Sequence, residues 1–167
     1  VLTSEDTSSA ELPAKMFING SPFSEDWSWD VAPELTPIHS HDGMFWGIYY
    51  FDENAEFKFN SAMAWDGNDF GAESGDAVEY GEYETGSNNF KIATAGYYQV
   101  LVITSLSEDK KMVNKKIIVS EPIPYVIGDC AAGGWDNQLA DADKFVLQGD
   151  TYVSPELNAG NLRMCVK

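Results

Sequence analysis

Short apolar runs separated by clusters of glycine, serine, proline and aspartate recur along the 167-residue chain. This pattern predicts strands and turns rather than helices. The run at residues 96–104 is the clearest strand. Because successive side chains of a strand point to opposite faces, Tyr98, Val100 and Val102 share one face and Leu101 lies on the other.

The same pattern predicts further strands, which in chain order cover residues 15–19, 43–51, 55–60, 89–93 and 112–119. Residues 43–51 are apolar on both faces, which suits a central strand buried on both sides. Turn residues follow this run directly, so we expect 43–51 and 55–60 to form a hairpin. Glycines recur within residues 62–88, which we expect to be mainly loop. The series of elements predicts an all-β fold, an antiparallel β-sandwich of the immunoglobulin-like or carbohydrate-binding-module-like kind.

Part of this pattern repeats after residue 120. Residues 124–129 resemble 15–21, residues 134–136 resemble 28–30, and residues 161–166 resemble 56–60. A repeat of domain size indicates tandem modules. The second copy has the counterpart of only the first half of a sandwich, which leaves strand edges and half a core uncovered.

We therefore predict three parts: a polar linker or arm at residues 1–13, a complete module at 14–120 and the first half of a second, truncated module at 121–167. The chain is expected to be a piece of a longer tandem protein. The half-module would pack against the first module, or another chain would complete it by strand exchange to give a dimer through 121–167.

Four of the five tryptophans lie between residues 16 and 71. Trp27, Trp29 and Trp65 occur in turn-like sequence, where a tryptophan is hard to bury completely, so they indicate a binding surface. Trp46 lies in the middle of a predicted strand and is expected in the core. Tyr49 points to the opposite face from Trp46, and we expect core packing for it as well.

The net charge is −17, from 27 acidic and 10 basic residues. Such a surface repels nucleic acid and anionic lipid, and it suits a neutral or cationic ligand or serves solubility alone.

No apolar run approaches the roughly 20 residues of a membrane span. Cys130 and Cys165 belong to no Cys-x-x-Cys pair, so they do not indicate zinc; one disulfide and two reduced thiols both remain open.

Several motifs occur in a characteristic order: Ile-x-Gly at 18–20, Trp-Asp at 29–30, Phe-Lys-Phe at 57–59, Trp-x-Gly-x-Asp-Phe-Gly at 65–71, Ala-Gly-Tyr-Tyr at 95–98, and a restart at 127–136 and 159–163. Together they resemble the SusE/SusF family, the surface glycan-binding lipoproteins of Bacteroidetes. The resemblance covers about residues 15–167. Two features of the family are missing, since the second module is incomplete and the lipidated cysteine and immunoglobulin-like domain do not occur.

The resemblance implies tandem carbohydrate-binding modules with no catalytic activity and no cofactor. They would bind polysaccharide or oligosaccharide on the extracellular face of the outer membrane, beside a glycan transporter, held by a lipid anchor outside this chain. The family pattern implies that Trp29 and Trp65 form an aromatic platform with Lys58. Trp135 and Arg163 hold the corresponding positions in the second copy, which we do not expect to bind well without its missing half.

Binding a sugar requires an aromatic surface for its C–H face, worth on the order of 1 kcal/mol, and polar partners for its hydroxyls. Lys58 alternates with Phe57 and Phe59, so it faces away from their core and can donate to hydroxyls. Two rings set at an angle follow the curve of an α-glucan, whereas coplanar rings suit a flatter chain. The sequence does not fix this angle, so the starch-like ligand that we predict is the one that the family resemblance implies.

Residues near this predicted platform supply further candidates. Asp66, Asn68 and Asp69 could accept hydrogen bonds from hydroxyls, and Trp27 is the alternate for Trp29. A tryptophan that merely closes one end of the core, and a Lys58 that is simply solvated, remain the alternatives.

Other functions have weaker support. Glycoside hydrolysis needs two carboxyls about 5–9.5 Å apart, but among 27 acidic residues such pairs arise by chance, so we predict no enzyme. His39 and His41 share a face without a third ligand, and residues 66–69 lack calcium-loop spacing, so we predict no metal site. A structural or adhesin-type surface module without a sugar ligand remains the alternative.

Overall fold

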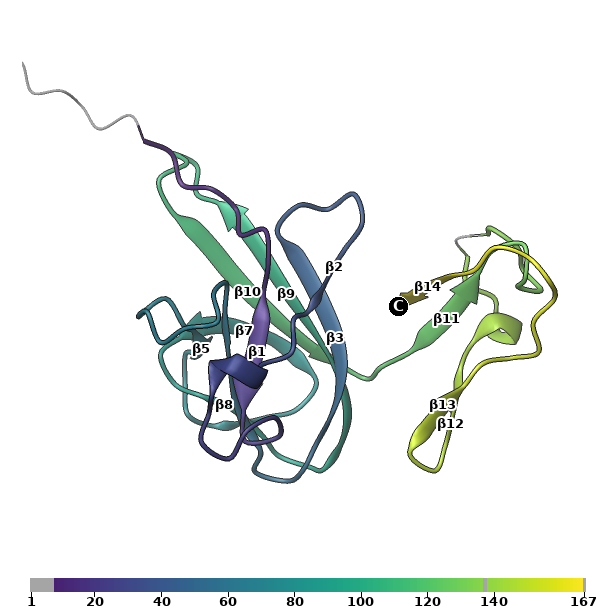
Figure 1. Cartoon of the computed structure of the whole chain (residues 1–167), viewed down its shortest axis with the longest axis horizontal. Helices are drawn as coiled ribbons and strands as arrows, with labels where there is room; N and C mark the ends of the chain where they lie inside the picture. The colour runs from purple at the N-terminus through teal and green to yellow at the C-terminus, as the bar shows by residue number, and fades with distance from the viewer. Residues whose placement is uncertain (1–7, 137, 167) are drawn as a thin grey trace, which may run out of the picture. The chain divides into compact units, whose positions relative to one another are not determined.

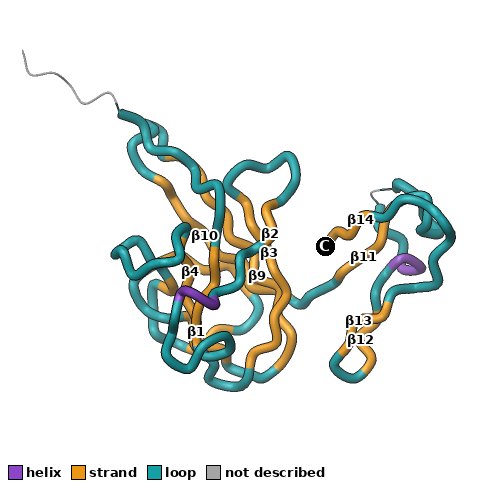
Figure 2. Tube along the Cα trace, in the orientation of Figure 1, coloured by secondary structure: helices purple, strands orange, loops and turns teal. Residues whose placement is uncertain are grey.

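The structure is a computed structural model that describes residues 8–136 and 138–166. The chain divides into two compact units, Val1–Glu121 and Pro122–Lys167. Strands are the main regular structure of both units, loops make up most of the second, and the described residues include two short 3₁₀ turns (Figures 1 and 2). No helix within the described ranges is long and apolar enough to cross a membrane.

Two sheets make up the first unit. The smaller has the strand order β1 (Phe17–Gly20), β4 (Glu56–Asn60), β8 (Phe90–Ile92) and β6 (Ala77–Val78). The larger has the order β2 (Thr36–Pro37), β3 (Met44–Phe51), β9 (Gly96–Leu106), β10 (Val113–Ser120), β7 (Gly81–Gly86) and β5 (Gly71–Ala72). Neighbouring strands are antiparallel, except that β6 and β8 are parallel. The predicted all-β, antiparallel architecture is confirmed.

Phenylalanines from both sheets form the core between them. Phe51 at the end of β3 stacks on Phe57 of β4 with ring centroids 4.7 Å apart, and Phe57 stacks on Phe90 of β8 at 5.3 Å. All three side chains are fully buried. Each buried ring contributes about 1.5–3 kcal/mol. The Phe51–Phe57 contact fastens one sheet to the other, whereas Phe57 and Phe90 are cross-strand neighbours within the smaller sheet.

The predicted hairpin between residues 43–51 and 55–60 is wrong. β3 pairs with β2 and β9, whereas β4 pairs with β1 and β8, so the two strands belong to different sheets. The tight turn between them, closed by Ala55 N donating to Asp52 O at 3.0 Å, carries the chain across the core. The crossing lets Phe51 and Phe57 meet from opposite sides of the core.

Residues 62–88 contain three strands, β5, β6 and β7, where mainly loop was expected. In β7 the core-facing Tyr83 alternates with Glu82 and Glu84, and Tyr83 lies opposite Ile117 of β10. This alternation is typical of a strand with one solvated face, but the charged residues and flanking glycines gave it the composition of a loop.

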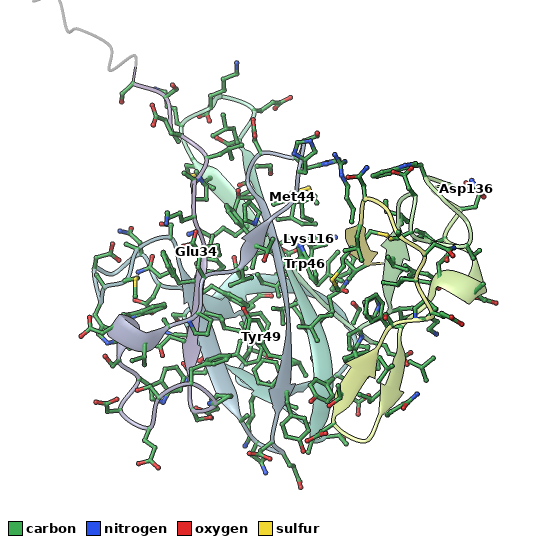
Figure 3. All side chains as sticks on the ribbon, turned by 45° about the vertical axis from the view of Figure 1, so that its right-hand side comes forward. Glu34, Met44, Trp46, Tyr49, Lys116 and Asp136 are labelled. Atoms are coloured by element: carbon green, nitrogen blue, oxygen red, sulfur yellow. The ribbon has the colours of Figure 1, made fainter. Side chains whose placement is uncertain are left out.

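The outer face of β3 carries Trp46. Tyr49 and Phe51 face the core, so Trp46 points the other way and is only partly buried; its predicted core position is wrong. For Tyr49 the predicted core packing is confirmed, because its ring meets Phe23 edge-on at 5.2 Å. Burial raises the pKa of Tyr49 to about 12. Figure 3 labels Trp46 and Tyr49 along this strand.

The second unit has two separate two-stranded sheets, β11 (Pro124–Ile127) with β14 (Arg163–Val166) and β12 (Val146–Gln148) with β13 (Thr151–Val153), and the 3₁₀ turn η2 (Asp141–Asp143). Its buried cluster is small and contains Val126, Cys130 and Ala131. Cys130 and Cys165 are free thiols. Three assignments stay predictions: the linker at 1–13, the complete module at 14–120 and the incomplete second copy at 121–167.

Candidate functional site

The outer face of the smaller sheet forms the floor of the candidate site. Asn19 on β1 lies directly opposite Lys58 on β4, and Phe17 lies opposite Asn60. These four residues alternate with core residues such as Ile18, so all of them face away from the core. Lys58 therefore faces away from the core, as predicted.

Trp29 lies over this floor at the start of the 3₁₀ turn η1 (Trp29–Val31). Ser28 caps the turn, its Oγ accepting from Asp30 N at 3.3 Å. The Trp29 side chain clusters with Phe17 and is only 3% exposed. Its Nε1 is buried without a hydrogen-bond partner among the described residues.

Trp65 projects from the connection between β4 and β5, residues 61–70, which we call the Trp65 loop. Its side chain is 57% exposed. The Trp65 and Trp29 rings meet edge to face, with centroids 5.4 Å apart and planes inclined at 70°. The two predicted platform residues therefore come together, but only Trp65 presents an open ring. Trp29, as it lies here, does not offer the solvent-facing surface expected of it.

Lys58 is paired rather than simply solvated. Its Nζ donates to Asp69 Oδ2 at 2.8 Å, and the two side chains are 14% and 15% exposed. This ion pair fastens the end of the Trp65 loop to β4. Because an ammonium group has three donors, Lys58 can still donate to a ligand.

Asp66 and Asn68 form the turn that follows Trp65. Asp66 Oδ1 accepts from Asn60 Nδ2 and from Asn68 N, each at 3.0 Å. These bonds, led by the one from Asn60, lower the pKa of Asp66. Gly67 between them has φ 82°, a left-handed conformation that glycine adopts without strain. Asp66 was predicted to accept hydrogen bonds from a sugar, but its Oδ1 is thus already used for hydrogen bonds within the site.

Trp27 contributes its backbone to the site. It has φ 57°, and its carbonyl accepts from Asn19 Nδ2 at 2.7 Å. Asn19 and Asn60, both fully buried, were not singled out from the sequence. An asparagine at a strand end suggests a turn, and the only signal of another role was its outward position in the alternation.

Trp135 and Arg163 come together in the second unit. The Arg163 guanidinium lies 5.5 Å from the Trp135 ring centroid, and Trp135 is 49% exposed. Asp129 accepts from Trp135 Nε1 at 2.7 Å and from Asn161 Nδ2 at 2.9 Å, and these bonds lower the pKa of Asp129. The buried Asp143 accepts from two backbone N–H groups just before Trp135.

A β-sandwich with an exposed tryptophan, a second tryptophan beneath it and an ion-paired lysine on one sheet face has the architecture of a carbohydrate-binding module. Residues 15–113 match the family described as SusF/SusE starch specific CBMs, CBM being a carbohydrate-binding module. The chain belongs to this family, which confirms the resemblance seen in its motifs. Because the family consists of binding modules, the module is non-catalytic, as predicted.

A curated relative and a solved structure agree with this assignment. Outer membrane protein SusF of Bacteroides thetaiotaomicron is 33% identical over 167 residues, which cover 92% of this chain and 32% of SusF. The crystal structure of SusF from the same bacterium superposes with a TM-score of 0.71 at 31% identity, covering 95% of this chain and 36% of that chain. The chain therefore spans about a third of the length of these relatives.

Proposed function

We propose that the first module binds starch-like α-glucan through the outer face of the β1–β4 pair. The observation that carries this proposal is the exposed Trp65 ring, set at 70° to Trp29 on the sheet face that also bears Lys58. The family's description as starch-specific supports the same ligand.

Each residue of the site has a distinct part in this proposal. Trp65 stacks on the apolar face of a sugar ring, and Lys58 and Asn68 contact hydroxyls. Trp29 supports Trp65 from below in the free protein.

The setting proposed for this binding is the cell surface. The relative SusF is named an outer membrane protein, which supports a membrane-associated location for this chain. We place the module on the extracellular face, held by a lipid anchor elsewhere in a longer protein and working beside a glycan transporter. The net charge of −17 does not oppose a neutral polysaccharide.

In the second unit, Trp135 and Arg163 form a smaller, weaker sugar contact in this proposal. An arginine beside an exposed tryptophan offers one stacking ring and charged donors, without a second aromatic partner among the predicted positions. Further strands of the longer protein would complete the unit. Strand exchange through residues 121–167 is the alternative, and a concentration-dependent dimer in solution would support it.

Affinity electrophoresis tests the proposed function. The chain is run through native gels that contain amylopectin, dextran, levan, xylan, mannan or pectin, with a non-binding protein as the reference. Retardation by amylopectin is the expected result. Retardation by another polymer alone would reassign the ligand, and retardation by none would favour a structural or adhesin-type module.

A further inference from the structure

Two fully buried asparagines lie on the sheet face that bears the site. Asn19 on β1 and Asn60 on β4 have no solvent exposure, although both point away from the hydrophobic core. A buried amide needs hydrogen-bond partners, since each unmet polar group is costly. The Nδ2 group of each amide donates into the connection that carries Trp29 or Trp65.

Asn60 binds the Trp65 loop on both sides of the tryptophan. Its Nδ2 donates to Ala64 O at 2.8 Å and to Asp66 Oδ1 at 3.0 Å. Its Oδ1 accepts from Ala62 N at 3.4 Å. The residues immediately before and after Trp65 are thus tied to one side chain on a rigid strand.

Asn19 has the same part in the other connection. Its Nδ2 donates to Trp27 O at 2.7 Å, two residues before Trp29, and its Oδ1 accepts from Gly20 N at 2.8 Å. Asn19 lies directly opposite Lys58 in the β1–β4 register. Each platform connection is therefore fixed to the strand beneath it by one buried amide.

We propose that Asn60 is the positioning residue of the glycan site, with Asn19 as its counterpart for the Trp29 connection. Neither amide can touch a sugar while buried, so each acts through the loop it holds. A loop ordered in advance loses less conformational entropy when the ligand binds, which raises affinity without a new contact. This proposal rests on the proposed function only for its effect on glycan affinity.

The anchoring can be measured without any glycan. Hydrogen exchange followed by NMR reports on the Asn68 amide, which donates to Asp66 Oδ1, the same oxygen that accepts from Asn60 Nδ2. Asn60→Ala should speed exchange at Asn68 at least about tenfold, as expected for the loss of an anchoring bond. Asn88→Ala is the matched control, because Asn88 Nδ2 donates to Glu73 O in a different connection. It should leave Asn68 unchanged.

Calorimetric titration with maltoheptaose supplies the second readout. Asn60→Ala should weaken binding about tenfold, roughly the effect of one lost hydrogen bond, while the variant stays folded and Asn88→Ala binds like wild type. Unchanged exchange and unchanged affinity in a folded Asn60→Ala would overturn the proposal. A wild-type protein that shows no heat of binding would instead refute the proposed function. The exchange experiment would still show whether Asn60 anchors the Trp65 loop.

A measurement on the wild-type protein covers the case in which Asn60→Ala fails to fold. The side-chain amide protons of Asn60 should exchange far more slowly than those of the exposed Asn114. Equal exchange rates for the two side chains would contradict the anchoring role.

Discussion

At the residue scale, the Asp66 carboxylate makes the stability of the Trp65 loop depend on pH. The hydrogen bond from the Asn60 side chain, followed by that from Asn68, lowers the pKa of Asp66 from its ordinary value of 3.8. A lowered pKa means that the folded state favours the carboxylate. The stabilisation is therefore fully present above the unfolded-state pKa and is lost as the pH falls through the lower, folded-state value.

Glycan affinity should consequently stay level from neutral pH down through the ordinary aspartate pKa of 3.8 and fall only at lower pH, as Asp66 takes up its proton. An NMR titration of the Asp66 carboxyl carbon, run beside maltoheptaose binding, measures both quantities. Asp66→Asn keeps an oxygen acceptor that does not titrate, so its loss of affinity in acid should be shallower. An equally steep loss in Asp66→Asn would show that another group controls the acid response.

The residues of the site were only partly predictable from the sequence. Trp65 and Lys58 could be found because turn context and strand alternation are local properties of the chain. The burial of Trp29 could not, because it depends on the Trp65 loop folding back over η1, a contact between segments far apart in sequence. The ion pair of Lys58 with Asp69 depends on the return of the loop to β4, where Phe70 pairs with Phe59.

At the element scale, β4 serves the core and the site at once. Phe57 and Phe59 fill the space between the sheets, while Lys58 and Asn60 face the site from the same strand. Alternation alone produces this division, so any one-residue shift of β4 would exchange core and site residues. The strand's register is therefore fixed by the core it fills.

Phe57→Ala should lower the free energy of unfolding by about 3–5 kcal/mol, because it removes a fully buried ring that stacks on both Phe51 and Phe90. Urea denaturation followed by circular dichroism measures the change. Tyr50→Ala removes an exposed ring and should change stability far less. Similar losses in both variants would mean that Phe57 is not central to the core.

The strands themselves were largely predictable, but their pairing was not. Apolar alternation located β3, β4, β9 and β10 within one or two residues. The turn after β3 was interpreted as a hairpin because a short connection between adjacent strands does not reveal whether the chain stays in one sheet. β7 was not predicted as a strand because its solvated face is acidic, which gives the segment the composition of a loop.

At the scale of the whole molecule, the two units share one local feature, a glycine at or just after the end of a strand that lies close to a partner segment. Gly20 ends β1 where an added Cβ would lie 2.1 Å from Glu56 O, and Gly128 follows β11 where it would lie 2.1 Å from Asn161 O. Both glycines permit the close approach of a partner segment. In the sequence they occupy matching places in the two copies of the pattern.

The central claim is that glycan binds at Trp65 in the first unit. The most direct test compares wild type, Trp65→Ala and Trp135→Ala in amylopectin gels, with circular dichroism as the check on folding. Both tryptophans are exposed, at 57% and 49%, so both variants should stay folded. We predict that Trp65→Ala abolishes retardation and Trp135→Ala preserves it. Full retardation of Trp65→Ala, or its unfolding, would contradict the account.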